Sequence, residues 1–147
     1  MHYRRILQPG ETFFFTVVTY QRRKPFTRQE NIDLLLKVID DIQQRYPFTI
    51  IAQVVMPDHI HSFWELPPGD QYYPTRWRLI KGTFTKLITK ESELDIPPSR
   101  RSKDEQAVWQ RRYWEHVIWD DLDLERHIDY IHFNPVHHGL VKYPCEW

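Results

Sequence analysis

Two histidines separated by a single residue are the clearest candidates for chemistry. His59 and His61 fall in a run, residues 59–66, that is typical of a β-strand, where alternate side chains face the same side. Their imidazoles would then lie next to each other and could hold a divalent metal, although such pairs also occur as ordinary polar residues of a strand. Zinc hydrolases that share this opening need Asp and His ligands directly after it, and because Ser-Phe-Trp follows here, we set that class aside.

A second polar group lies near the C-terminus. Tyr130 and Asn134 are four residues apart in a stretch with helical spacing, so they share one side of the helix, and His127 lies on the same side. The apolar Ile128 and Ile131 face elsewhere. This polar stripe could present a phenol for nucleophilic attack, or it could be structural, with a packed tyrosine whose hydroxyl is in solvent and an amide at the helix end.

The elements that must position these groups follow from the apolar periodicity. Residues 12–20 are rich in aromatic and β-branched residues and predict a buried strand. Thr27 and Glu30 have the spacing of a capping box, which predicts a helix that ends at Tyr46. Two antiparallel strands joined by a short turn are expected next, over residues 48–55 and 59–66.

The middle of the chain repeats the helix-then-strand pattern. Thr75 can cap a helix over residues 75–90. Its basic side chains are expected in solvent, namely Arg76, Arg78, Lys81, Lys86 and Lys90. Residues 93–106 are dense in charge and proline and predict a surface loop, and residues 108–118 predict a fourth strand.

A last helix from Asp120 or Asp121 to Asn134, where Pro135 ends it, completes the order of elements. The order is that of an α+β, ferredoxin-like split βαβ fold: an antiparallel sheet of four to five strands, two crossover helices on one face, and an extra C-terminal helix that carries the tyrosine. With 147 residues and 41% apolar content, the chain is long enough for one core, so we expect a single domain over residues 1–147. That fold hosts many functions, so the site must decide the activity.

Charge is balanced overall but unevenly distributed. Twenty basic and twenty acidic residues give zero net charge, yet residues 1–28 and residues 76–112 each carry a net charge of +5. A fold that joins these segments would present a cationic face, whereas scattered, solvated charge is the alternative. The candidate phosphate contacts are Arg22, Arg23, Lys24, Lys81, Lys86, Arg111 and Arg112.

Membrane and secretory classes are not favoured. The N-terminus begins with polar and basic residues, and no run of apolar residues is long enough to span a bilayer. The single cysteine, Cys145, cannot form a disulfide within the chain. We therefore expect a cytoplasmic protein.

The motifs taken together resemble the single-tyrosine HUH transposases. They are residues 56–61 (MPDHIH), 130–136 (YIHFNPV) and 139–141 (GLV). Within that group the chain is most similar to the REP-associated tyrosine transposases, which also have strands like residues 16–23 and 109–118, so the resemblance covers nearly the whole chain. It implies that His59 and His61 are metal ligands, that Tyr130 is the catalytic nucleophile, and that Asn134 is the third ligand.

The resemblance also implies the substrate and the assembly. The partner would be single-stranded DNA that folds into imperfect, REP-like hairpins, which would associate the protein with the nucleoid. The REP-associated group favours a monomer, with a homodimer as the alternative.

The implied chemistry agrees with the residue types. A phenol has a pKa of about 10, so its ionisation at neutral pH needs a base or an activating field, and His127 on the same stripe is a candidate for that help. Two imidazoles and an amide oxygen suit Mg²⁺ or Mn²⁺ when the scissile phosphate supplies negative charge. Attack by the phenol would give a 5′-phosphotyrosine and a free 3′-hydroxyl. The alternatives are a non-catalytic DNA-hairpin-binding protein used by its host, and a metal-dependent hydrolase that uses water.

Overall fold

One antiparallel sheet organises the protein. The computed structural model describes the backbone of residues 11–91 and 108–137, and all side chains in these ranges except those of residues 89–91 and 133–137. The sheet order is β2-β3-β1-β4, with β1 at Thr12–Val18, β2 at Thr49–Met56, β3 at His59–Glu65 and β4 at Trp114–Val117. This is the predicted ferredoxin-like split βαβ arrangement.

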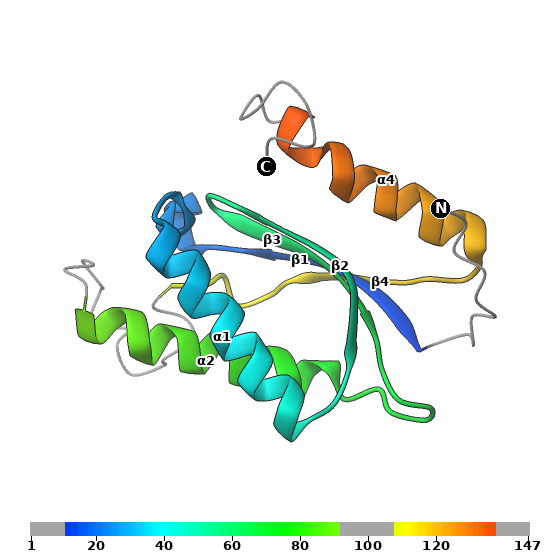
Figure 1. The fold of residues 1–147 in the computed structure, drawn as a ribbon, viewed down its shortest axis with the longest axis horizontal. Coiled ribbons are helices and arrows are strands. Elements are labelled where there is room, and N and C mark those ends of the chain that lie inside the picture. Colours follow the sequence, from blue (N-terminus) through cyan, green and yellow to red (C-terminus); the bar gives the residue numbers. More distant parts are fainter. Residues whose placement is uncertain (1–10, 92–107, 138–147) are drawn as a thin grey trace.

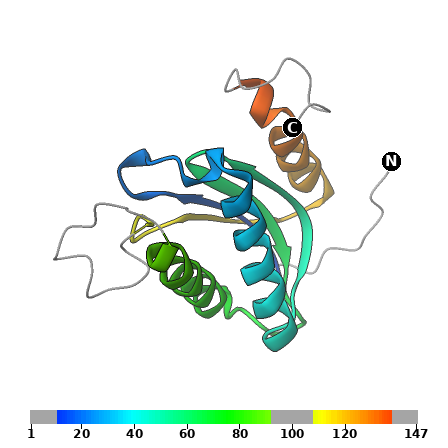
Figure 2. The same cartoon turned by 60° about the vertical axis from the view of Figure 1, so that its left-hand side comes forward.

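The helices lie on both faces of the sheet. Helices α1 (Gln29–Arg45) and α2 (Tyr73–Glu91) cover one face, and α4 (Asp121–His137), the extra C-terminal helix, lies across the other (Figure 1, Figure 2). Two short 3₁₀ turns, Tyr20–Arg22 and Pro25–Thr27, connect β1 to α1. No helix in residues 11–91 and 108–137 is long and apolar enough to cross a membrane.

The sheet is buried on both faces because its strands carry two apolar sets. Phe13, Phe15 and Val17 of β1 belong to the larger core cluster, which includes residues of α1 and α2. Phe14 of β1 and Phe63 of β3 point to the opposite face, where they pack under α4. The α4 residues of that second cluster are Leu124 and Ile131, with Ile128 packed against it. The continuous apolar run of β1 is therefore explained by a strand covered on both sides.

The boundaries of α1 and α4 differ in part from the sequence predictions. The capping box at Thr27 is wrong, since its hydroxyl donates to the carbonyl oxygen of Lys24 (2.9 Å) and α1 begins only at Gln29. The end of α4 at Asn134 is also wrong, because α4 continues past Pro135 to His137. A proline this close to a helix end removes only one backbone donor.

The predicted start of α4 is confirmed, whereas the fourth strand is shorter than expected. The Asp120 carboxylate accepts a hydrogen bond from the backbone N–H of Asp123 (2.8 Å), which is the geometry of an N-cap. Within residues 108–118 only Trp114–Val117 form a regular strand, and Trp109 makes an isolated bridge with Thr19.

Two basic residues predicted to lie in solvent are buried instead. Arg76 is 3% exposed and Lys81 is 2% exposed. The Arg76 guanidinium donates to two carbonyl oxygens just after α1 and pairs with the Asp70 carboxylate (2.8 Å). The Lys81 ammonium donates to the carbonyl oxygens of Gln110 and Arg111 just before β4 (3.0 and 3.4 Å). Both cations donate hydrogen bonds to backbone carbonyl groups that lie outside the strands and helices. The spacing of apolar residues in the sequence does not reveal this role.

The pairing of Asp70 with Arg76 predicts a pH-dependent stability. The hydrogen bond from Arg76 lowers the pKa of Asp70 below its usual value and outweighs the opposing effect of burial. The stabilisation is therefore present above the ordinary pKa of about 4 and is lost as the pH falls through the lowered value. Asp70→Asn should cost about 1 to 3 kcal/mol in the free energy of unfolding at neutral pH, measured by urea denaturation. The difference from the parent protein should shrink in acid, and a cost independent of pH would contradict this assignment.

Candidate active site

The two histidines project from β3 toward α4. Antiparallel pairing places His61 opposite Thr16 of β1 and leaves His59 at the end of the sheet, next to the turn that joins β2 to β3. Both histidines are 4% exposed, and their ring centroids are 4.8 Å apart. The predicted placement on one face is confirmed, and Ile60 between them points into the larger core on the other face.

Each imidazole is oriented by a contact on its Nδ1 atom. His59 Nδ1 lies 2.6 Å from a carboxylate oxygen of Asp58, and His61 Nδ1 lies 2.9 Å from the Thr16 hydroxyl. With Nδ1 engaged, the nitrogen that each ring can offer to a metal is Nε2, as in metal sites where a second partner fixes the histidine ligand. Burial raises the pKa of Asp58, but its interactions with His59 and Arg22 outweigh burial, so the net pKa lies below the usual range.

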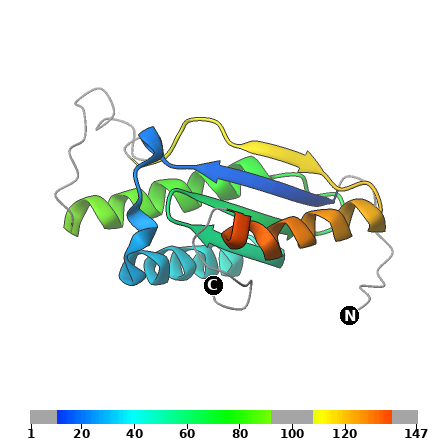
Figure 3. The same ribbon diagram turned by 90° about the horizontal axis from the view of Figure 1, so that it is seen from above.

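Tyr130 lies beside the histidine pair in the same chain. Its ring centroid is 5.2 Å from that of His61, at an angle of 73°, and its side chain is 46% exposed. The next residue of α4, Ile131, is buried between the helix and the sheet. This contact anchors the helix and leaves Tyr130 at the edge of the contact with the sheet. Figure 3 shows α4 lying along one face of the sheet, and the ring contact between His61 and Tyr130 places the β3 histidines on that face. Asn134 belongs to α4, but its side chain lies outside the described residues.

An open pocket adjoins the tyrosine. Its volume is about 450 Å³, within the range of ligand sites. Three aromatic rings, one hydroxyl, one imidazole and one guanidinium line it: Phe14, Tyr130, Trp114, Thr16, His127 and Arg126. Trp114 is 52% exposed. An aromatic wall, a cation and a phenol in one pocket suit a flat, anionic ligand such as a nucleotide.

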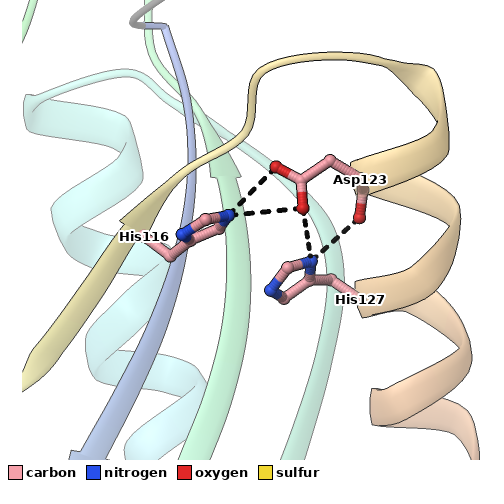
Figure 4. A group of neighbouring side chains, drawn as sticks. All are labelled: His116, Asp123 and His127. Carbon is pink, nitrogen blue, oxygen red and sulfur yellow. Dashed lines mark hydrogen bonds and ion pairs between the residues drawn. The ribbon is translucent and has the colours of Figure 1, made fainter.

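Several residues at the site were not identified as site residues from the sequence. Thr16 belongs to a strand far from the histidines in the chain, and only the register of β1 against β3 brings it to His61. Asp58 could have been found, because it directly precedes His59 in the turn. His116 and Asp123, which contact His127, come from β4 and the first turn of α4 (Figure 4). Neither stands in a recognisable metal or catalytic motif.

Parts of the two basic segments lie next to each other in the fold. The backbone N–H of Tyr20 donates to the carbonyl oxygen of Val108 (2.7 Å), and that of Gln110 donates to Val18 (2.9 Å). The segment after β1 and the segment before β4 are therefore neighbours. Among the predicted phosphate contacts, the exposed or half-exposed residues are Arg22, Arg23, Lys24, Lys86, Arg111 and Arg112. The buried Lys81 is bound to carbonyl oxygens, which weighs against a role in phosphate contact.

Comparisons with known proteins assign the family. The family described as IS200-like transposases matches residues 12–134. Over 145 residues the chain is 37% identical to the REP-associated tyrosine transposase of Escherichia coli (strain K12), covering 99% of this chain and 78% of that protein. A Haemophilus influenzae protein with a provisional assignment as a REP-associated tyrosine transposase is 38% identical over 146 residues. The match covers 99% of this chain and 82% of that protein. The chain belongs to the REP-associated tyrosine transposases.

A solved structure agrees with this assignment. It is the structure of a REP-associated tyrosine transposase bound to a REP hairpin, and it matches with a TM-score of 0.79 and 37% identity, covering 100% of this chain and 79% of that one. The resemblance drawn from the sequence motifs and the α+β fold are thereby confirmed. Membership of a tyrosine transposase family makes the chain an enzyme that cleaves and rejoins DNA.

Proposed function

We propose that this REP-associated tyrosine transposase is a metal-dependent single-stranded DNA endonuclease and strand transferase that works through a 5′-phosphotyrosine on Tyr130. The observation that carries the proposal is the contact between the rings of Tyr130 and His61, 5.2 Å apart within one chain. A half-exposed phenol thereby meets two oriented imidazoles at the edge of an open pocket. A tyrosine with only a structural role would need neither the imidazole pair nor the pocket.

The covalent adduct separates this proposal from its alternatives. Labelled hairpin DNA incubated with the protein and Mn²⁺ should give a protein-linked band on a denaturing gel. A non-catalytic hairpin binder would give a complex on a native gel only. A hydrolase that uses water would release cut DNA with no linked band.

The proposed substrate is single-stranded DNA that folds into a REP-type hairpin. The support is the solved relative, which is bound to a REP hairpin and is 37% identical over the whole of this chain. The pocket beside Tyr130 is suited to an unpaired nucleotide that flanks the hairpin, with its base stacked on Trp114 and its phosphate near Arg126.

His59, His61 and Asn134 are the residues that would hold the metal. The two histidines fit such a role because Asp58 and Thr16 engage their Nδ1 atoms, which directs coordination to Nε2. Mg²⁺ or Mn²⁺ suits this neutral donor set when a substrate phosphate adds negative charge. When bound, the ion withdraws charge from the scissile phosphate and offsets the charge of the transition state.

The residues of the chain then supply the nucleophile and the proton acceptor. The Tyr130 oxygen forms a bond to the scissile phosphorus, the bond from phosphorus to the 3′-oxygen breaks, and that oxygen leaves as a 3′-hydroxyl after taking a proton. The phenol proton needs an acceptor, and His127 lines the same pocket. Attack of another 3′-hydroxyl on the phosphotyrosine reverses the steps, so no nucleotide cofactor is needed.

One chain contains the phenol and the imidazole pair. This arrangement supports a monomer that cleaves with its own tyrosine. A homodimer that exchanges α4 between subunits is the alternative, and measurement of mass in solution by light scattering during cleavage separates the two.

Asp58→Asn is predicted to weaken metal binding without removing a ligand. The asparagine keeps the size of the side chain but replaces the charged acceptor on His59 Nδ1, so the imidazole becomes a poorer and less oriented donor. The Mn²⁺ concentration that gives half-maximal cleavage should rise about 10- to 100-fold, with most activity restored at saturating metal. Asp40→Asn on the exposed side of α1 is the matched control. An unchanged metal requirement would contradict the orienting role.

Hairpin binding is predicted to depend strongly on salt. If several phosphates are contacted, raising the salt from about 50 to 200 mM should weaken binding roughly tenfold or more. Replacement of both Arg111 and Arg112 by alanine should reduce the slope of log affinity against log salt by about 1.5 to 2. Lys37→Ala on α1 is the control and should leave the slope unchanged. A flat response in the parent protein would remove the case for a cationic DNA-binding face.

A further inference from the structure

A second group of potential metal ligands lies between β4 and α4, apart from the histidine pair of β3. His116 of β4 and His127 of α4 both contact the carboxylate of Asp123, which stands in the first turn of α4 (Figure 4). The distance from His116 Nε2 to Asp123 Oδ2 is 3.0 Å, and that from His127 Nδ1 to Asp123 Oδ1 is 3.1 Å. One donor atom from each residue lies within 4.8 Å of the others.

The surroundings keep these two groups separate. The ring of Phe14 lies against His61 (5.5 Å between centroids) and also against His127 (4.9 Å), so an apolar ring stands between the two sets of imidazoles. The side chains of His116, Asp123 and His127 are 30%, 22% and 21% exposed. They are therefore held in place but still open to solvent on one side.

The carboxylate at the centre is fixed by further hydrogen bonds. The backbone N–H of Trp119 donates to Asp123 Oδ2 (3.1 Å), and the N-cap contact from Asp120 fixes the Asp123 backbone. Burial raises the pKa of Asp123, but the Trp119 donor and the two histidines outweigh it, so the net pKa is lowered and the group is ionised at neutral pH. Partners of this kind hold metal-binding carboxylates in position.

We propose that His116, Asp123 and His127 form a second metal site, one that binds a divalent transition metal of the Zn²⁺ type. Two imidazoles and one carboxylate are a donor set that Zn²⁺ binds in proteins. No substrate phosphate is proposed here to add the oxygen ligands that Mg²⁺ prefers, in contrast to the site at His59 and His61. Measured to the single oxygen Oδ1 of Asp123, the donor distances are 3.3 Å from His116 Nε2 and 3.1 Å from His127 Nδ1. Both are close to the edge of about 3.3 Å expected for a tetrahedron with zinc bonds of about 2.0–2.1 Å. The open side leaves a fourth position for water.

An ion at this site would replace a proton. His127 Nδ1 also lies 2.8 Å from the backbone carbonyl oxygen of Asp123, which is the arrangement of a protonated nitrogen that donates to an oxygen. A ligating nitrogen must carry no proton, so the proton of the neutral ring moves to Nε2 when Nδ1 binds the metal. Metal binding and acceptance of the phenol proton are therefore alternative states of His127. The ion would then join the edge strand β4 to the first two turns of α4, and the next residues of that helix include Tyr130. The site would hold the tyrosine helix against the sheet.

The test uses a protein in which the first histidine pair is absent. The His59→Ala, His61→Ala double variant, freed of metal by dialysis against a chelator, is titrated with Zn²⁺ in a calorimeter. We expect one saturable Zn²⁺ per chain. Adding Asp123→Asn or, separately, His116→Ala to this background should weaken binding at least about tenfold. His132→Ala, at an exposed histidine of the same helix, is the matched control and should bind as the background does.

The outcomes are decisive in both directions. Circular dichroism on each variant checks that the total helix content is retained, and His116→Ala changes no residue of α4. The absence of saturable Zn²⁺ binding in the background protein, or binding that Asp123→Asn and His116→Ala leave unchanged, overturns the proposal. Neither result bears on the nuclease proposal, because DNA cleavage is measured separately on the protein with His59 and His61 intact.

Discussion

Tyr130→Phe is expected to abolish the protein-linked DNA band and to reduce hairpin cleavage by at least about a thousandfold. The substitution removes one oxygen atom, the proposed nucleophile, and keeps the ring that packs against His61 and Phe14. The fold and the stacking contacts should therefore persist. The measurement is denaturing electrophoresis of labelled hairpin DNA after incubation with Mn²⁺, with the linked band and the cut strand quantified against time.

Two comparisons make this result specific. Hairpin affinity of Tyr130→Phe on a native gel should match that of the parent protein, because the lost hydroxyl acts in the reaction. Tyr72→Phe changes another exposed tyrosine, which is 71% exposed and directly precedes α2, and this variant should cleave normally. Cleavage that survives Tyr130→Phe would show that water or another side chain attacks the phosphate, and the hydrolase alternative would replace the transesterification mechanism.

The fold could be predicted from the sequence because its signals are local. Alternation in β3 put His59 and His61 on one face, and the i to i+4 spacing put Tyr130 and Asn134 on one stripe of a helix. The burial of Arg76 and Lys81 could not be predicted in this way, since each is buried to satisfy carbonyl oxygens of segments distant in the chain. Helical periodicity treats a cation as a solvent-facing residue and carries no information on unpaired carbonyl groups.

The site shows the same division between local and distant information. The residues that could take part in the reaction could be identified from the sequence, whereas the residues that orient them could not. Thr16 reaches His61 only through the register of β1 with β3, and His116 reaches Asp123 only because α4 folds back across the sheet after β4. Register and the placement of a helix on a sheet depend on the packing of both apolar clusters. A single sequence does not encode those contacts in any short motif.

Replacement of His59 and His61 together by alanine is expected to abolish cleavage and leave hairpin binding within about twofold. The phosphate contacts proposed for binding lie on other segments, so affinity should depend on the basic residues, whereas catalysis loses both imidazole ligands. Native and denaturing gels on the same samples measure the two effects, and excess Mn²⁺ should not restore cutting because the donors themselves are missing.

Burial makes a second variant necessary for this test. Both histidines are 4% exposed, so the double alanine change leaves a cavity that could lower stability. His61→Asn keeps more of the volume and a polar atom near Thr16, and it should also lose cleavage, with its melting temperature compared with that of the parent protein. If either variant stays folded yet loses hairpin affinity, the imidazoles serve DNA binding or the architecture of the sheet, and the catalytic metal must then be sought elsewhere in the chain. If both variants stay folded, bind the hairpin normally and lose only DNA cleavage, then activation of the phosphate depends on the β3 histidines.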